Sequence, residues 1–186
     1  YEIDATLAAE GEQVFNRNCA SCHGRYGGAG GDYPNKIVSI DVVGTDRVRL
    51  DALTAEHRRR YAESWFHEDD REQVNEQPAG YVAPPLDGIW ATAPYLHNGS
   101  VPTLWHLLHA EQRPVLWSRR DNGFDRERMG INAATHDRLP ESANSLHQRR
   151  QYFDTRRFGK SAAGHRFPEK LNEQQKRAVL EFLKTL

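Results

Sequence analysis

Both ends of the chain have the residue spacing of amphipathic helices. Near the N-terminus, the residues at helical spacing are Leu7, Gly11, Val14, Phe15 and Asn18. Near the C-terminus, Asn172 is followed three residues later by Gln175, which predicts a capped helix start. The apolar stripe of this second helix is Val179, Phe182, Leu183 and Leu186. Glycine allows close helix approach, so we expect Gly11 and Phe15 to pack opposite Phe182.

The middle of the chain has weaker patterns. Residues 24–31 are rich in glycine and predict a loop, whereas the β-branched residues of 37–43 predict a short strand. Helical spacing over 54–66, behind a Thr54 cap, predicts a helix. The aromatic stretch 81–105 is interrupted by prolines, so it cannot form a long helix, but it could wrap a flat apolar object. A short helix is expected at Leu104, Leu107 and Leu108.

The length of the chain suits one domain, and its composition is unusually polar. The protein has 186 residues, of which 38% are hydrophobic, and its mean hydropathy is −0.81. This supply of apolar side chains is lean, so something else is expected to fill the core. No apolar run approaches the roughly 18 residues of a membrane helix. The net charge of −1 indicates no general attraction to nucleic acid or an anionic membrane.

The most specific motif is Cys19-Ala20-Ser21-Cys22-His23, which has the pattern C-x-x-C-H. Cys19 and Cys22 are the two cysteines of the chain. Two thiols at this spacing can bind the two vinyl groups of one porphyrin, and the adjacent imidazole is then the proximal ligand of the iron. The motif therefore predicts one covalently attached haem c, with His23 as an axial ligand.

Three other chemistries use paired cysteines. A structural zinc site needs four ligands, and the sequence has no second cysteine pair and no suitably spaced histidine pair. A thioredoxin-like pair would start a helix after a strand, but this pair ends a helical pattern. A disulfide or two free thiols is the remaining alternative to haem attachment.

The string GIWATAPYLHNGSVPTLWHLL, residues 88–108, resembles the haem c domain of the bacterial dihaem cytochrome c peroxidase superfamily, and most closely its rubber oxygenase branch. Weaker similarities surround Val43–Asp46, Arg113–Pro114, Phe124–Asp125, Phe153–Thr155 and Gly164–His165. The resemblance covers most of residues 11–186. The enzymes of this superfamily use two haems, whereas this chain has one C-x-x-C-H motif. The matching domain is their C-terminal one, which relays electrons.

The resemblance implies a mainly α, cytochrome c-like fold. We expect one domain over residues 1–186, with the N- and C-terminal helices packed around one covalent haem. Long irregular loops and an insertion at roughly 32–80 would complete it. The haem pocket candidates are Phe15, Trp90, Pro94, Tyr95, Leu96 and Leu104.

The residues alone do not decide which side chain is the sixth ligand of the iron. Met129 is the single methionine, and His/Met ligation is common in cytochromes c. The resemblance instead favours His165, which matches the distal histidine that follows a glycine in the rubber oxygenase branch. Met129 then becomes a core residue. We expect His97 to hold a turn or a haem edge, and His106 and His109 to be partly exposed.

These features predict an electron-transfer cytochrome with both axial positions filled. It would exchange electrons with an extracytoplasmic redox partner and carry no catalytic residues. The alternatives are a haem peroxidase or oxygenase with an open distal site, and a haem module that senses a gas or ligand. Haem c is assembled outside the bacterial cytoplasmic membrane, so we expect a periplasmic or extracellular protein. Because the chain starts at Tyr1, we expect a mature protein or a domain excised from a larger one, from which a signal peptide is absent.

Overall fold

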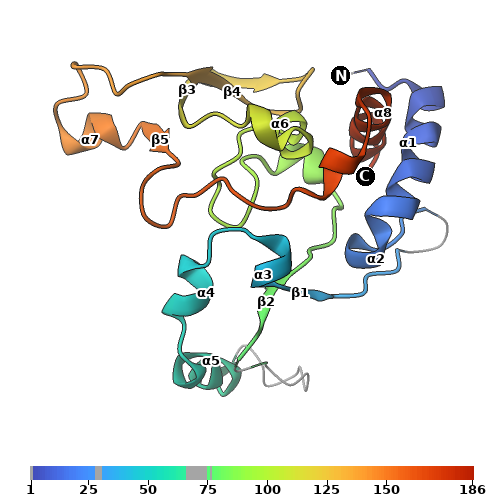
Figure 1. Cartoon of the computed structure of the whole chain (residues 1–186), viewed down its shortest axis with the longest axis horizontal. Coiled ribbons are helices and arrows are strands. Elements are labelled where there is room, and N and C mark those ends of the chain that lie inside the picture. The colour runs from blue at the N-terminus through green and yellow to red at the C-terminus, as the bar shows by residue number, and fades with distance from the viewer. Residues whose placement is uncertain (1, 28–30, 66–74, 76) are drawn as a thin grey trace.

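The computed structural model describes residues 2–27, 31–65, 75 and 77–186, and it combines helices with antiparallel sheets (Figure 1). The described α-helices are α1 (Ala5–Asn18), α2 (Ala20–His23), α3 (Ile40–Val43), α4 (Val48–Ala52), α5 (Ala55–Ala62), α6 (Leu104–Leu108), α7 (Leu146–Arg149) and α8 (Glu173–Leu183). The strands are β1 (Ile37–Ser39), β2 (Gly80–Val82), β3 (Leu116–Asp125), β4 (Gly130–Thr135) and β5 (Tyr152–Asp154). Short 3₁₀ helices are η2 (Ile89–Ala91), η3 (Ala110–Gln112) and η4 (Phe167–Lys170).

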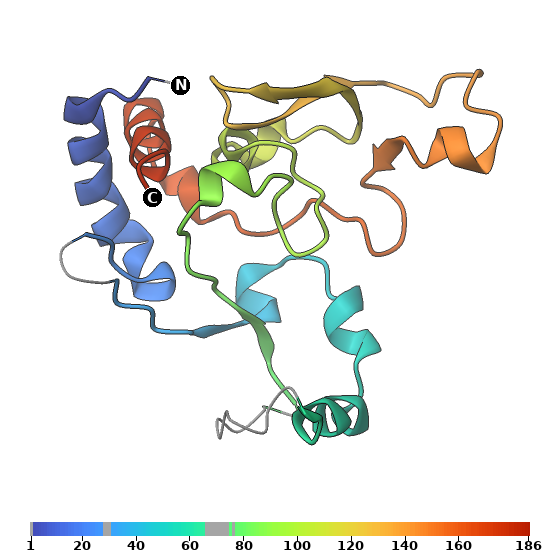
Figure 2. The same ribbon diagram turned by 180° about the vertical axis from the view of Figure 1, so that it is seen from behind.

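The terminal helices α1 and α8 lie side by side, as both views of the ribbon show (Figures 1 and 2). Gly11 is buried against the backbone of Ala178, where a side chain would have no room. The ring centres of Phe15 and Phe182 are 5.2 Å apart. The predicted packing of Gly11 and Phe15 opposite Phe182 is therefore confirmed.

The predicted caps agree with the structure better than the predicted ends do. Asn172 and Gln175 form the capping box that starts α8. Thr54 caps α5, which ends at Ala62; residue 66, the expected end, lies outside the described residues. The helix α8 ends at Leu183, before the predicted stripe residue Leu186, whose carbonyl accepts hydrogen bonds from the Gly88 backbone and the Trp90 indole.

The expectation of a mainly α domain is wrong, because two antiparallel sheets form within the described chain. One has the strand order β4-β3-β5, and the other pairs β1 with β2. The charges of Arg119, Arg120 and Asp121 interrupt any alternation of apolar and polar positions along β3, which hid this strand. The sheet is fixed by tertiary contacts, since Trp117 of β3 stacks on Phe153 of β5, with 5.3 Å between ring centres.

The predicted strand over 37–43 is half right. It ends at Ser39, whose hydroxyl accepts a hydrogen bond from the Asp41 backbone and starts α3. The chain between β1 and β2 carries α3, α4 and α5, which lie on the side of the molecule away from the larger sheet (Figure 1).

The hydrophobic core lies where α1, α6 and α8 meet the irregular segment that follows β2. Its fully buried members include Val101, Leu104 and Met129. This segment wraps the core without a long helix, as its prolines predicted. Among the described residues, no helix is both long enough and apolar enough to cross a membrane.

Candidate haem-binding site

The cysteine motif forms a single helical turn directly after α1. Cys19 ends α1 and starts α2, and its carbonyl accepts hydrogen bonds from the backbone of Cys22 and His23, each at 3.1 Å. Cys19 and Cys22 are half-buried, and neither is in a disulfide. Burial raises the pKa of Cys19 to about 11, although Lys170 opposes this shift. A redox-active thiol needs a lowered pKa, so this environment disfavours the thioredoxin-like alternative.

The His23 ring is oriented by a backbone carbonyl. Its Nδ1 lies 3.0 Å from the carbonyl oxygen of Pro84. A carbonyl can only accept, so Nδ1 carries the proton and Nε2 keeps its lone pair. This is the usual arrangement of a metal-binding histidine, whose second nitrogen donates to an acceptor outside the metal site.

Tyr26 connects this turn to the core. Its hydroxyl donates to the carbonyl of His23 at 2.8 Å and accepts from the Leu86 backbone at 2.6 Å. Its ring lies 5.9 Å from Phe15 and 6.5 Å from Phe182, measured between ring centres. The orientation of His23 therefore depends on the packing of α1 against α8.

His165 lies in the irregular segment before η4, in a backbone conformation that is unusual for a histidine. Its φ is 48°, and Gly164 before it has a φ of 79°. The His165 backbone donates to the carbonyl of Val43 at 2.6 Å. Gly164 lies so close to the Gly44 backbone that a side chain would overlap it. The contact with residues 43–45 thus determines where the imidazole of His165 lies.

The rings of His23 and His165 are neighbours in a T-shaped arrangement, with 6.1 Å between their centres and 64° between their planes. Two imidazoles that bind one metal ion from opposite sides, with nitrogen–metal bonds of about 2.0–2.1 Å, have ring centres about 6.4 Å apart. Burial lowers the pKa of both rings, and that of His165 falls to about 4. Both are therefore neutral at pH 7, the form that binds metals. The pair fits the two axial ligands of one iron.

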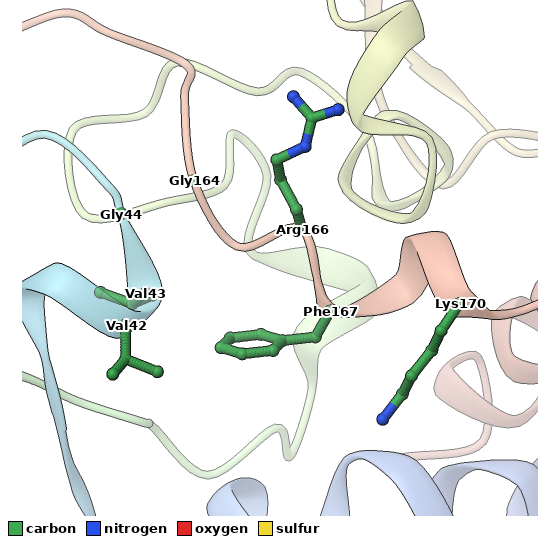
Figure 3. A pocket seen from close by; sticks show the side chains of 7 residues that line it. All are labelled: Val42, Val43, Gly44, Gly164, Arg166, Phe167 and Lys170. Carbon is green, nitrogen blue, oxygen red and sulfur yellow. The ribbon is translucent and has the colours of Figure 1, made fainter.

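A cavity of about 490 Å³ lies beside His165, a volume typical of cofactor sites. The residues that line it are Val42, Val43, Gly44, Gly164, Arg166, Phe167 and Lys170 (Figure 3). Phe167 points toward Val42 and Val43. Val42 is 64% exposed and Phe167 is 40% exposed, which leaves apolar surface for a flat apolar group to cover. The cavity and the paired imidazoles together fit a haem.

Among the described residues, no group of three or more His, Cys, Asp or Glu side chains could hold a metal ion. A structural zinc site needs four such ligands, whereas the porphyrin supplies most of the ligands of a haem iron. Two imidazoles are too few for such a zinc site but are enough for the axial positions of a haem iron.

Met129, the alternative sixth ligand, lies in the hydrophobic core. It is fully buried, and its carbonyl accepts hydrogen bonds from the Leu104 backbone at 2.9 Å and the Tyr95 hydroxyl at 3.4 Å. Its neighbours are those of a core residue, and the ring that lies opposite His23 is that of His165.

The pocket candidates gather in the hydrophobic core and do not line the cavity beside His165. Phe15, Tyr95 and Leu104 are buried, and Trp90 and Leu96 are half-buried in the same cluster. Pro94 follows a cis peptide bond in the same segment.

His97, His106 and His109 pack against other side chains of the described structure. His97 stacks on Tyr81, with 4.2 Å between ring centres. The expectation that His106 and His109 are partly exposed is wrong, since they are 6% and 5% exposed. His106 Nδ1 lies 2.7 Å from the hydroxyl of Thr103, and His109 stacks on Trp105.

The sequence reasoning missed Pro84, Phe167 and Lys170. Pro84 acts through its backbone carbonyl, which any residue could supply. The residue type at position 84 therefore could not predict this contact. Phe167 follows His165 by two residues, and its ring lies 5.4 Å from the imidazole. Val43 and Gly44 belong to one of the weaker similarities to the peroxidase superfamily. That similarity was the sequence feature that could have indicated the wall of the cavity.

Two family models match this chain. Residues 80–118 match the RoxA-like, cytochrome c-like family, and residues 6–64 match the cytochrome C oxidase, cbb3-type, subunit III family. The second match contains the cysteine motif, and the first contains the whole string over 88–108.

Two relatives come from Sinorhizobium fredii, and both are uncharacterized proteins. The protein y4iM is 30% identical over 192 residues, which cover 89% of this chain and 42% of the relative. The protein y4iJ is 27% identical over 245 residues, which cover 99% of this chain and 39% of the relative. The chain thus spans less than half the length of these relatives.

Proposed function

We propose that this chain, a c-type cytochrome resembling the RoxA haem domain, transfers electrons through one covalently bound haem held between His23 and His165. The observation that carries the proposal is the 6.1 Å separation between the ring centres of the two imidazoles. Iron with both axial positions filled changes oxidation state without gaining or losing a ligand. An enzyme that activates oxygen or peroxide needs one open position, so the imidazole pair favours electron transfer.

Each residue of the site has a distinct role in this proposal. Cys19 and Cys22 would form the thioether bonds to the porphyrin, and the carbonyl of Pro84 would keep the proton on Nδ1 of His23. Val42, Val43 and Phe167 line the cavity and would contact an apolar part of the haem. The haem supplies a one-electron Fe(III)/Fe(II) couple when bound. Two imidazole ligands give a lower reduction potential than His/Met ligation, because a thioether stabilises the ferrous state.

The compartment and the partner follow from this chemistry. The chain would work outside the cytoplasmic membrane, where haem c is assembled, and would donate electrons to or accept them from a redox protein there. Residues 1–186 would form one domain with an insertion at roughly 32–80, which contains β1 and ends where β2 begins.

The test is the optical and EPR spectrum of the ferric protein, followed by reduction under carbon monoxide. We expect one haem per chain that stays attached after denaturation, a low-spin spectrum without a sulfur-to-iron band, and no carbon monoxide adduct. His165→Ala should give high-spin ferric haem and a ready adduct. Met129→Leu, the matched control, should keep the wild-type spectrum because the replacement has a similar volume.

Two results would contradict this ligation. A low-spin spectrum that persists in His165→Ala would exclude His165, and its loss in Met129→Leu would assign the sixth position to the methionine. A wild-type protein that binds carbon monoxide readily would have an open iron, which would favour the peroxidase, oxygenase or sensor alternatives.

A further inference from the structure

Arg113 uses every N–H group of its guanidinium on backbone carbonyls. Nε donates to His106 at 3.2 Å; Nη1 donates to Ala162 and Gly164, both at 2.7 Å; Nη2 donates to Leu107 at 3.2 Å and His165 at 3.4 Å. A guanidinium has five N–H donors, and these five bonds use them all. No ion pair of Arg113 occurs among the described residues. Burial lowers its pKa to about 10, so it is charged at neutral pH.

The five acceptors belong to two segments that are distant in sequence. His106 and Leu107 are in the last turn of α6, whose carbonyls lack helical partners. Ala162, Gly164 and His165 form the irregular segment that presents the distal imidazole. α6 belongs to the buried core, so Arg113 joins this segment to a fixed part of the molecule.

The segment needs such support because its backbone is strained. The positive φ of His165 is unfavourable for a residue with a Cβ, and such conformations persist only where the surroundings determine them. Besides the bond from Arg113 to its carbonyl, the His165 backbone donates a hydrogen bond to the carbonyl of Val43. A buried charge without a carboxylate partner is costly, and an uncharged residue could not supply five fixed donors.

We propose that Arg113 is a positioning residue for the distal iron ligand, holding the backbone of residues 162–165 so that His165 faces His23. The proposal rests on the proposed function, in which both imidazoles bind the iron. Arg113 contacts neither imidazole through its own hydrogen bonds. Its effect on the iron passes through the backbone that carries His165.

Two substitutions test the proposal. Arg113→Lys keeps the positive charge but has three donors on a single nitrogen, which cannot span both segments; Arg113→Gln also removes the charge. In both variants we expect part of the ferric haem to become high-spin. After reduction, part of the ferrous haem should form a carbon monoxide adduct, which we do not expect in the wild type. Free imidazole should restore the low-spin spectrum, because the haem and its proximal ligand remain in place.

Arg149→Lys is the matched control. Arg149 also donates through Nε to a backbone carbonyl, that of Ala143, and it lies in α7, at the end of the molecule away from α1 and α8 (Figures 1 and 2). The spectrum of Arg149→Lys should equal that of the wild type. Far-UV circular dichroism of every variant checks that the chain is folded.

The outcomes separate this proposal from the proposed function. If His165→Ala loses the low-spin spectrum but both Arg113 variants keep it, only the positioning role is refuted. If His165→Ala itself keeps the low-spin spectrum, the ligation fails and the positioning role with it. Should Arg113→Gln not fold, Arg113→Lys decides, and failure of both to fold would assign Arg113 to general stability and overturn the proposal.

Discussion

The contact between α1 and α8 depends on the absence of a side chain at Gly11. A Cβ at this position would overlap the carbonyl group of Ala178 and lie 3.0 Å from the Cβ of Phe182. Most of this overlap is with backbone, which cannot rotate away as a flexible side chain would. Gly11→Ala therefore forces the two helices apart or tilts one of them.

The size of the effect comes from two opposing contributions. In a helix interior, alanine is more favourable than glycine by about 0.5–1 kcal/mol. Overpacking of a well-packed contact costs about 1–3 kcal/mol, and backbone overlap falls at the upper end of that range or above it. We expect Gly11→Ala to lower the free energy of unfolding by about 2 kcal/mol. For a chain of this length, that corresponds to a melting temperature about 4–8 °C lower.

Urea unfolding, followed by far-UV circular dichroism, measures this difference on the haem-loaded protein. The matched control is Ala9→Gly, the reverse exchange at an exposed position of α1, which should cost about 1 kcal/mol through helix propensity alone. If Gly11→Ala is as stable as the wild type or more stable, propensity outweighs packing and the close contact deduced for α1 and α8 is refuted.

Two further changes test other parts of the structure. Burial lowers the pKa of His106 to about 4, so between pH 6.5 and pH 4 the unfolded chain binds more protons than the folded one. The free energy of unfolding should fall over this range by up to about 3 kcal/mol as the pH is lowered. His106→Asn should remove this part of the pH dependence in urea titrations, and an unchanged dependence would contradict the assignment. Gly164→Ala places a Cβ against Gly44 at a positive φ, so the ferric spectrum should become partly high-spin; an unaltered spectrum would show that the segment carrying His165 tolerates the change.

The local features of the fold were predictable from the sequence. A cap such as Asn172 or Thr54 acts on the backbone two or three residues away, so its signal lies within one window of sequence. The same holds for the C-x-x-C-H motif, which occupies one helical turn. The contact of Gly11 with α8 was predictable because glycine in a helix has few other uses when it lies on the apolar face.

The features set by distant contacts were not predictable in this way. The strand β3 contains Arg119, Arg120 and Asp121, and its pairing with β4 and β5 replaces any local preference. His106 and His109 look like surface residues on a short helix. Their burial follows from partners that come together only in the folded chain, such as Glu173, whose carboxylate lies 3.0 Å from Nε2 of His109.

The two proposed ligands of the iron differ in how the chain fixes them, and this explains why one was derived from residues and the other from resemblance. His23 is held by its own helical turn, by the neighbouring cysteines and by the carbonyl of Pro84. His165 is held by contacts to Val43 and Arg113, which belong to other segments. Because no local motif surrounds the second ligand, its position depends on how the other segments fold around the site. In the proposed site, a substitution on the distal side would therefore change the ligation of the iron and leave Cys19, Cys22 and His23 in place.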